Sequence, residues 1–273
     1  MSYKTLLVHL DERPRRRERL QLGLQLAGRF DAHLVGLFAM QSARVPSYAL
    51  AEAGAIIEEI ETRRRREAAR AAEDEFREAQ RRAAAKAEWR LSMDDPLAAV
   101  RLSARYADLV IAGQPDPEDP VSMDFAGEVV LSAGRPVLFV PYAGHYLDAG
   151  KRVLVAWNGS REATRAVTDA MPFLARAEAV EVVAFDPREG EHGELAGADL
   201  ALYLARHGVK ASAARQNAPD VEIGAQLLSR AADTSADLIV MGGYGHSRLR
   251  ELVLGGATRT LLESMTVPVL MAH

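Results

Sequence analysis

The chain of 273 residues contains no cysteine, very little lysine and no long apolar run. The absence of cysteine excludes disulfide bonds, thiolate nucleophiles and zinc sites with cysteine ligands. Because no stretch approaches 18 consecutive apolar residues, the sequence predicts no membrane-spanning helix and no membrane partner. The apolar stretch near the N-terminus is too short for a secretory signal. We therefore expect a cytoplasmic protein.

Charges of the two signs nearly cancel, with 34 basic and 38 acidic residues and a net charge of −4. A nucleic-acid-binding domain usually carries an excess of basic residues, so this balance argues against a nucleic-acid partner. Hydrophobic residues make up 48% of the chain. A chain of this length and composition can bury a sizeable core without covalent cross-links.

The sequence repeats itself. The segment ADLVI at 107–111 resembles ADLIV at 236–240, and RPVLFV at 135–140 resembles VPVLM at 267–271. Earlier in each copy, a short apolar strand, a helical pattern and a second apolar strand follow one another in the same order. Two copies of one unit explain these matches best.

Short apolar strands alternate with helical patterns throughout each copy. Such alternation is typical of a parallel sheet with helices on both faces, whose strands read as continuous apolar runs. We therefore predict an α/β fold with two tandem doubly wound domains, each with a five-stranded mostly parallel sheet. The first domain is expected at 1–140 and the second at 151–273, with a linker at 141–150.

A long helix is predicted in the first copy, from about residue 48 to residue 89. This segment is rich in Ala, Glu, Arg and Gln and contains no proline. Glu–Arg pairs four residues apart support it by roughly 0.2–0.5 kcal/mol each; they are Glu59–Arg63, Glu61–Arg65 and Glu73–Arg77. The helix is either an arm that binds a partner or a second copy, or a solvated crossover helix lengthened by insertion.

The strongest signal for a ligand is a glycine-rich stretch in the second copy. Gly242 and Gly245 follow a predicted strand, and Gly255 and Gly256 precede a helical pattern that begins at Ala257. Glycine lets backbone N–H groups approach a ligand closely, and the first turn of a helix attracts anions. In open parallel sheets, ligands bind beyond the carboxyl ends of the strands, where the strand order reverses. The glycines therefore predict a phosphate site; the alternative is that they only mark turns and tight helix–strand packing, without a ligand.

The spacing Gly-x2-Gly-x9-Gly from Gly242 to Gly255 resembles the nucleotide-binding signature of the universal stress protein family, in its tandem two-domain form. The strand VPVL at 267–270 and the β-α-β order of nearly the whole chain resemble the same family. The resemblance implies an adenine nucleotide alpha hydrolase-like fold and a stress-survival protein that binds ATP or AMP, with or without Mg²⁺. It implies weak ATP hydrolysis at most, and no catalytic residues are proposed.

The resemblance also suggests how the two copies meet. Final strands of this family meet across a dimer, so the strands at 135–140 and 267–272 are expected to pair within one chain. The result would be an intramolecular pseudo-dimer, and the long helix could add a further homodimer.

Individual residues follow from the signature and the strand ends. Gly256 stands where the family has Ser or Thr, so a backbone N–H remains but a hydroxyl is lost. Asn158 stands where ATP-binding relatives carry Asp, and it accepts a hydrogen bond without charge. His246 and Arg248 either neutralise phosphate charge or belong to a solvated loop. The predicted nucleotide-binding residues are Ala156, Asn158, Gly242, Gly245, His246, Arg248, Gly255, Gly256 and Ala257.

The first copy departs from the signature. Its loop at 113–120 carries three prolines, which lack N–H donors, and three acidic residues, which repel phosphate. We expect this copy to have lost the nucleotide site, with Asp11 as a helix-cap or loop residue. Ser160 is expected to cap a helix, and so is the pair Asp94–Asp95, which precedes Pro96.

Three functions stay open from the sequence. The first is a nucleotide-responsive stress protein, and the second is a protein-interaction module of the same fold that uses the long charged helix. The third is a small-ligand sensor that uses the pocket of the first copy. No metal site is predicted, because the seven histidines show no ligand spacing.

Overall fold

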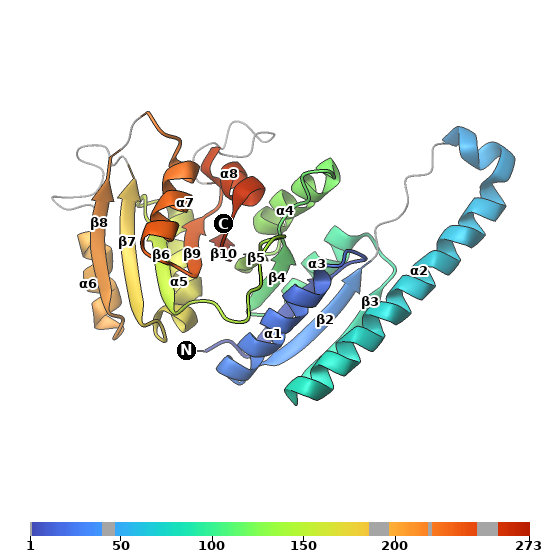
Figure 1. The fold of residues 1–273 in the computed structure, drawn as a ribbon, viewed down its shortest axis with the longest axis horizontal. Coiled ribbons are helices and arrows are strands. Elements are labelled where there is room, and N and C mark those ends of the chain that lie inside the picture. The colour runs from blue at the N-terminus through green and yellow to red at the C-terminus, as the bar shows by residue number, and fades with distance from the viewer. Residues whose placement is uncertain (1, 40–46, 186–196, 218–219, 245–255) are drawn as a thin grey trace.

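The structure, a computed structural model, describes residues 2–39, 47–185, 197–217, 220–244 and 256–273 (Figure 1). Strands and helices alternate along the chain. In the first half they are β1 (Thr5–Leu10), α1 (Arg16–Phe30), β2 (His33–Ala39), α2 (Ser47–Ala83), β3 (Ala87–Ser92), α3 (Pro96–Ala104), β4 (Leu109–Gly113), α4 (Pro120–Ser132) and β5 (Val137–Val140). In the second half they are β6 (Arg152–Ala156), α5 (Arg161–Leu174), β7 (Ala179–Phe185), α6 (Ala198–Arg206), β8 (Ala211–Gln216), α7 (Ile223–Asp233), β9 (Leu238–Gly242), α8 (Gly256–Ser264) and β10 (Val269–Ala272).

The described strands form one 10-stranded sheet in the order β3-β2-β1-β4-β5-β10-β9-β6-β7-β8. Neighbouring strands are parallel within each half. The halves join where β5 and β10 pair antiparallel, with Leu138 opposite Leu270. The predicted α/β fold with a doubly wound, mostly parallel arrangement of five strands in each half is therefore confirmed, and so is the pairing of the two final strands, which joins the halves into one sheet.

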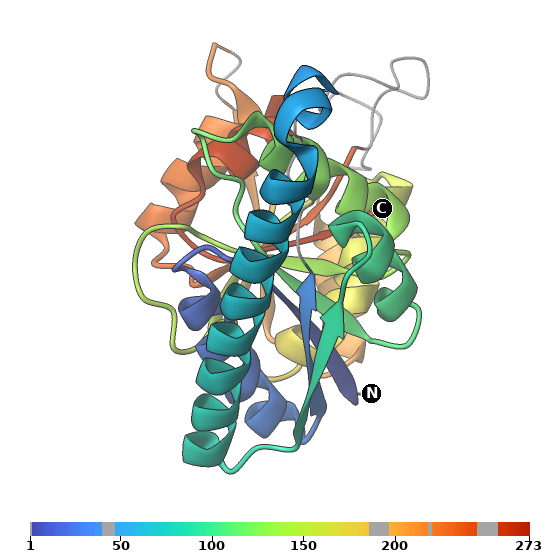
Figure 2. The ribbon, with the colours of Figure 1, turned by 90° about the vertical axis from the view of Figure 1, so that its right-hand side faces the viewer.

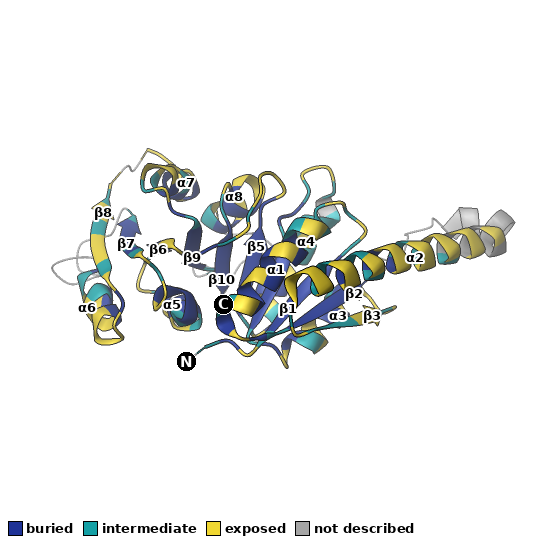
Figure 3. Ribbon diagram, turned by 60° about the horizontal axis from the view of Figure 1, so that its bottom comes forward, coloured by how far each residue is buried: buried dark blue, intermediate teal, exposed yellow. Residues whose placement is uncertain are grey.

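Helices cover both faces of the sheet. Apolar residues of α1, α2, α5 and α6 pack in one cluster, and those of α3, α4, α7 and α8 pack in the other. In β1, Leu6 and Val8 face the first cluster and Leu7 faces the second, since successive side chains of a strand point to opposite faces. Figure 3 shows the central strands in the colour of buried residues, whereas the edge strands β3 and β8 are partly exposed. Burial on both faces explains why the central strands read as unbroken apolar runs.

The long helix α2 is the crossover between β2 and β3, and it runs along the side of the first half (Figure 2). The predicted end near residue 89 is wrong, because α2 ends at Ala83 and Trp89 lies in β3. The chain reverses at Ala84, whose φ of 48° is left-handed. Trp89 then packs against Phe38 and Phe76, with ring centroids 5.7 and 5.6 Å away. This aromatic packing decided the boundary, which helix propensity alone did not reveal.

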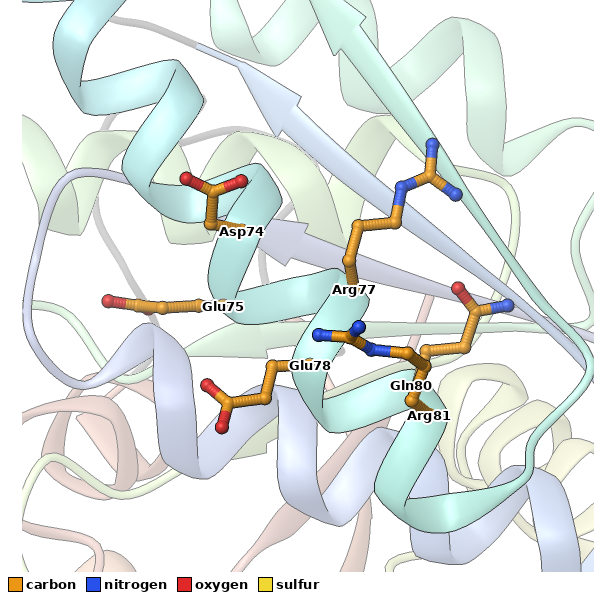
Figure 4. A pocket seen from close by; sticks show the side chains of 6 residues that line it. All are labelled: Asp74, Glu75, Arg77, Glu78, Gln80 and Arg81. Atoms are coloured by element: carbon orange, nitrogen blue, oxygen red, sulfur yellow. The ribbon is translucent and has the colours of Figure 1, made fainter.

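Charged side chains cover the outer surface of α2. Figure 4 shows Glu75 and Glu78 leaving the helix on one side and Arg77 and Gln80 on the other. The carboxylate of Glu75 accepts hydrogen bonds from Arg16 and Arg17 of α1, each over 2.8 Å. The hollow of about 630 Å³ in this view is therefore bordered by side chains of a single helix, one of which already pairs with α1.

Two of the predicted Glu–Arg pairs of α2 are present. Arg63 lies 3.2 Å from Glu59, and Arg77 lies 3.3 Å from Glu73. The side chain of Glu61 lies outside the described part. The N-terminal part of α2 extends beyond the sheet in Figures 1 and 3.

Candidate functional site

The strand order reverses twice, once between β1 and β4 and once between β6 and β9. From β6 the chain proceeds outward to β7 and β8 and then returns to β9 on the other side. Such reversals open crevices at the carboxyl ends of the strands. Ala156 ends β6 and Gly242 ends β9, and these strands pair with Val155 opposite Val240. Two of the predicted site residues thus lie at the same edge of the sheet.

The loop after β6 is organised by its own polar side chains. Asn158 accepts a hydrogen bond from the backbone N–H of Ser160 over 3.1 Å. Ser160 in turn caps α5, since its hydroxyl accepts from the backbone N–H of Ala163 over 3.1 Å. The predicted cap is therefore confirmed. Asn158 is exposed, so its side-chain amide can still donate to a ligand at this edge.

Gly242 allows α5 to approach β9 closely. A Cβ at this position would lie 2.5 Å from the backbone N of Ala163 and 2.7 Å from the backbone C of Glu162. Real Cβ atoms do not come this close, so any other residue would push the first turn of α5 away. Gly243 has a similar role, because its Cβ would lie 2.8 Å from Val130 of α4. The two glycines thus have packing reasons for their presence, independent of a ligand.

The N-terminus of α8 begins at Gly256, which is exposed, with Ala257 half-buried behind it. Gly245, His246, Arg248 and Gly255 of the predicted site lie outside the described residues. The first turn of a helix offers N–H groups without intrahelical partners to an anion. Gly256 and Ala257 are therefore at a suitable place for a phosphate group.

A carboxylate that the sequence did not single out lies beside this turn. Glu222 Oε1 would be 3.0 Å from a Cβ on Gly256, and it accepts a hydrogen bond from the hydroxyl of Thr260 over 2.7 Å. A negative charge at a helix N-terminus is favourable in itself. It also repels any phosphate that approaches the same turn.

Thr258 ties the loop after β9 to α8. Its buried hydroxyl oxygen accepts from the backbone N–H of Tyr244 over 3.4 Å. Tyr244 has a left-handed φ of 64°, and its hydroxyl has no hydrogen-bond partner among the described residues. Burial, with a smaller effect of Glu128, raises the pKa of Tyr244 far above its ordinary value. Neither Thr258 nor Thr260 thus presents an unused hydroxyl in place of the one missing at Gly256.

The reversal between β1 and β4 holds a pocket of about 640 Å³. Asp11 lies at its edge and accepts hydrogen bonds from Arg19 Nη2 over 2.6 Å and from the backbone N–H of Arg13 over 3.1 Å. Burial, the largest single effect, raises the pKa of Asp11, but the charge and hydrogen bond of Arg19, together with His9 and Arg13, lower it more, so that it lies below its usual value. The helix α1 has Arg15 as its N-cap, without a side-chain cap. Asp11 is therefore a loop residue.

The N-terminus of α4, which corresponds to that of α8, is closed by the chain itself. Asp119 caps it and accepts from the backbone N–H of Val121 over 3.1 Å. Pro120 is the first helical residue and contributes no N–H. Arg13 forms an ion pair with Asp119. A carboxylate of the protein thus lies where a phosphate would bind.

His9 lies deep in the same pocket. Its ring lies tilted by 38° against the ring of Phe125, with ring centroids 4.9 Å apart, and only 6% of the residue is exposed. Its Nε2 has no hydrogen-bond partner in the part of the chain that the structure describes. Burial lowers the pKa of His9 to about 4, so the imidazole is neutral near pH 7. No local sequence pattern pointed to His9, because its neighbours come from distant segments.

The described ranges contain no group of three histidine or acidic side chains that could hold a metal ion. None of their helices is both long and apolar enough to cross a membrane.

Comparison with known proteins shows which family the second half resembles. A family model described as the universal stress protein family matches residues 150–273. A universal stress protein from Synechocystis is 47% identical over 38 residues, which cover 14% of this chain and only 13% of that relative. The resemblance inferred from the glycine signature is thereby confirmed.

Two solved structures are similar over nearly the whole chain. A universal stress protein from Archaeoglobus fulgidus has a TM-score of 0.72 at 15% identity, covering 98% of this chain and 95% of that one. A putative universal stress protein from Pseudomonas aeruginosa has a TM-score of 0.57 at 15% identity, covering 99% and 93%. At this identity the similarity concerns the fold, which extends over both halves.

Proposed function

The second half of the chain, residues 150–273, belongs to the universal stress protein family, and from this premise we propose that the protein binds an adenine nucleotide in a stress response. The nucleotide would be ATP or AMP, and its site would be the crevice at the carboxyl ends of β6 and β9. The first half would have no nucleotide site.

One observation carries the proposal. The edge at which β6 and β9 end carries Ala156 and Gly242 at the ends of these adjacent strands and Asn158 in the loop after β6, at the reversal of the strand order. This is the position at which open α/β sheets bind ligands. The signature glycines connect this edge to the exposed N-terminus of α8 at Gly256.

Each residue has a role in the proposal. The backbone N–H groups of Gly256 and Ala257 would bind phosphate, and Gly245, Gly255, His246 and Arg248 would complete the phosphate site. The amide of Asn158 would contact the ribose or the base, with the small side chain of Ala156 leaving room beside it. Mg²⁺, if present, would be bound mainly by the phosphates, as is usual for this ion. Binding, not turnover, is what these groups support.

The proposal is tested by calorimetry on the full chain after bound nucleotide has been removed. We expect saturable binding of AMP and ATP, with and without MgCl₂. The variant Gly256→Asp should weaken binding about tenfold, because it adds a carboxylate at the helix N-terminus. Gly256→Asn is the matched uncharged control and should bind nearly as the wild type. Absence of binding at millimolar nucleotide would reject the proposal.

A second candidate function is an interaction module that uses α2. It is favoured by two isoleucines on the extended part of this helix, Ile56 and Ile60, of which 64% and 55% is exposed. Exposed apolar side chains on a projecting helix are typical of an interaction surface. Sedimentation of the wild type and of the double variant Ile56→Lys, Ile60→Lys tests self-association. A concentration-dependent dimer that the variant lacks would support this function, and a monomer in both would count against a homodimer.

A further inference from the structure

The pocket of the first half is formed by five segments that are far apart in the sequence. Its volume of about 640 Å³ lies in the range of roughly 300–1,000 Å³ that is usual for small-molecule sites. Part of its wall is apolar and includes Ala39, Leu97, Pro115, Val121 and Phe125. The pocket therefore has room for a compact organic molecule with an apolar body.

The charges around this pocket are unequal. Six carboxylates line it, against three guanidinium groups, and Arg19, which pairs with Asp11 without lining the pocket, leaves an excess of two negative charges. The carboxylates belong to Asp11, Glu12, Asp95, Asp119, Asp124 and Glu128. Three of them form ion pairs: Asp11 with Arg19, Glu12 with Arg64, and Asp119 with Arg13. Within the described residues, Asp95, Asp124 and Glu128 form no ion pair.

Both helix N-termini at the pocket are closed to anions. The cap of α3 is Asp95, which accepts from the backbone N–H of Ala98 over 3.1 Å, with Pro96 as the first helical residue. The cap of α4 is Asp119, again followed by a proline. In each helix the first N–H is therefore absent and another is bound by a carboxylate of the chain. A phosphate would find few donors and much negative charge here.

The buried imidazole of His9 is a separate observation. It lines the pocket, lies against the ring of Phe125, and carries a ring nitrogen without a partner in the described part of the chain. Buried polar atoms of a folded protein are nearly always hydrogen-bonded, so such an atom calls for a donor or acceptor from outside. A neutral imidazole can accept a hydrogen bond from an ammonium group. The aromatic ring beside it offers a face that attracts cations.

We propose that the pocket between β1, β4, α3 and α4 binds an organic cation with an apolar chain, of the polyamine class. Ammonium groups would pair with Asp95 on α3 and with Asp124 and Glu128 on α4, and the chain between them would lie on Leu97 and Phe125. Carboxylates on two separate helices favour a ligand with more than one ammonium group. The proposal does not depend on nucleotide binding, since that site lies in the other half.

Spermidine is the probe, titrated into the full chain at low and at moderate ionic strength. We expect saturable binding of one spermidine per chain. The double variant Asp124→Asn, Glu128→Gln should weaken it about tenfold, because both side chains are exposed and outside the ion-pair network. Asp199→Asn, Asp220→Asn is the matched control, which removes two exposed charges from the second half and should leave the affinity unchanged.

A second variant separates a specific site from general attraction to acidic residues. Phe125→Leu keeps every charge but removes the aromatic face, and it should weaken spermidine binding severalfold while unfolding cooperatively. Equal loss in both charge variants, no saturation with spermidine, or binding of AMP that displaces spermidine would each overturn the proposal.

Discussion

Gln114 of the first half donates a hydrogen bond from its Nε2 to the backbone carbonyl oxygen of Glu263 in α8, over 3.0 Å. Its Oε1 accepts from the backbone N–H of Tyr142 over 2.9 Å, and only 5% of the residue is exposed. Gln114 also lines the pocket of the first half. Gly256, at the proposed phosphate site, is seven residues before Glu263 in the same helix, about 10 Å along its axis. One buried side chain of the first half is thus hydrogen-bonded to the far end of the helix whose N-terminus is the proposed phosphate site.

Replacing this side chain should destabilise the protein. Gln114→Leu leaves the carbonyl of Glu263 and the N–H of Tyr142 without their partner in a buried place. We expect the free energy of unfolding to fall by about 1–3 kcal/mol, measured by urea denaturation. Gln21→Leu, at an exposed position of α1, is the control and should change it little. Equal stability of both variants would show that the bridge contributes nothing.

Replacing two glycines by alanine should change the stability of the protein in opposite directions. Gly242→Ala puts a methyl group 2.5 Å from the backbone of α5 and should cost about 1–3 kcal/mol. Gly28→Ala, on the exposed face of α1, meets no atom within 4 Å and should stabilise by about 0.5–1 kcal/mol. Thermal unfolding of the two variants checks both signs. If Gly242→Ala were as stable as the wild type, tight packing would not be the reason for this glycine.

Because His9 is buried, we expect the free energy of unfolding to depend on pH. Burial lowers its pKa from 6.5 to about 4; Asp11 opposes this shift, and Arg19 and Arg13 add to it. Between these two values the unfolded chain binds the proton and the folded chain does not. Stability should therefore fall as the pH falls through this window, by about 2 kcal/mol between pH 7 and pH 5.

His9→Phe removes this titration and should flatten the decline between pH 7 and pH 5, as measured by urea denaturation at each pH. His207→Gln, at an exposed histidine of the second half, should keep the wild-type slope. The contribution of Asp11 does not interfere. Its pKa is lowered below 3.8, so its stabilisation is complete above that value and is lost only at lower pH. An unchanged slope in His9→Phe would contradict the prediction.

Restoring the hydroxyl of the family signature should strengthen nucleotide binding. Gly256→Ser adds a donor at the first turn of α8, where a hydrogen bond to phosphate is worth about 1.5 kcal/mol or roughly tenfold in affinity. Gly256→Ala is the matched control, because it adds the same Cβ without the hydroxyl. Both variants require the flexible end of Glu222 to move by a few tenths of an ångström. Calorimetry with AMP should rank Ser above Ala, and equal affinities would argue against a phosphate at this turn.

Neutralising Glu222 should have a similar effect for another reason. Its carboxylate lies beside the first turn of α8, and Glu222→Gln removes a negative charge while keeping the acceptor for Thr260. We expect a two- to fivefold higher affinity for AMP, about 0.5–1 kcal/mol, and a larger gain for ATP. Glu263→Gln, near the other end of the same helix, is the control and should leave the affinity as it is. A loss of affinity in Glu222→Gln would identify this residue as a ligand group.

The element order could be predicted from sequence because its signals are local. The second apolar strand predicted in the first copy is present as β2 (His33–Ala39). Ser160 and Asp95 were recognisable as caps because the N–H groups that they bind lie three residues away. The end of α2 was misjudged because the segment up to Trp89 has helix-forming composition, while the aromatic contacts that pull Trp89 into β3 come from Phe38 and Phe76.

Of the two proposed ligand sites, one has a local sequence signal and the other has none. The glycine spacing after β9 is a local pattern, so the sequence alone could predict a phosphate site in the second half. The position of Glu222 beside Gly256 could not be predicted, because no sequence pattern relates these two residues. The pocket of the first half, with His9, Gln114 and Phe125, depends on strands and helices that meet only when the sheet forms.

By itself, the sequence determined the repeat, the parallel α/β order, the caps and the glycine signature, because each depends on residues near one another along the chain. Only the tertiary structure decided that His9, Gln114 and Phe125 line one pocket in the first half, and that Glu222 stands beside Gly256. These features depend on contacts between segments distant in sequence, and such contacts are set by the packing of the whole fold.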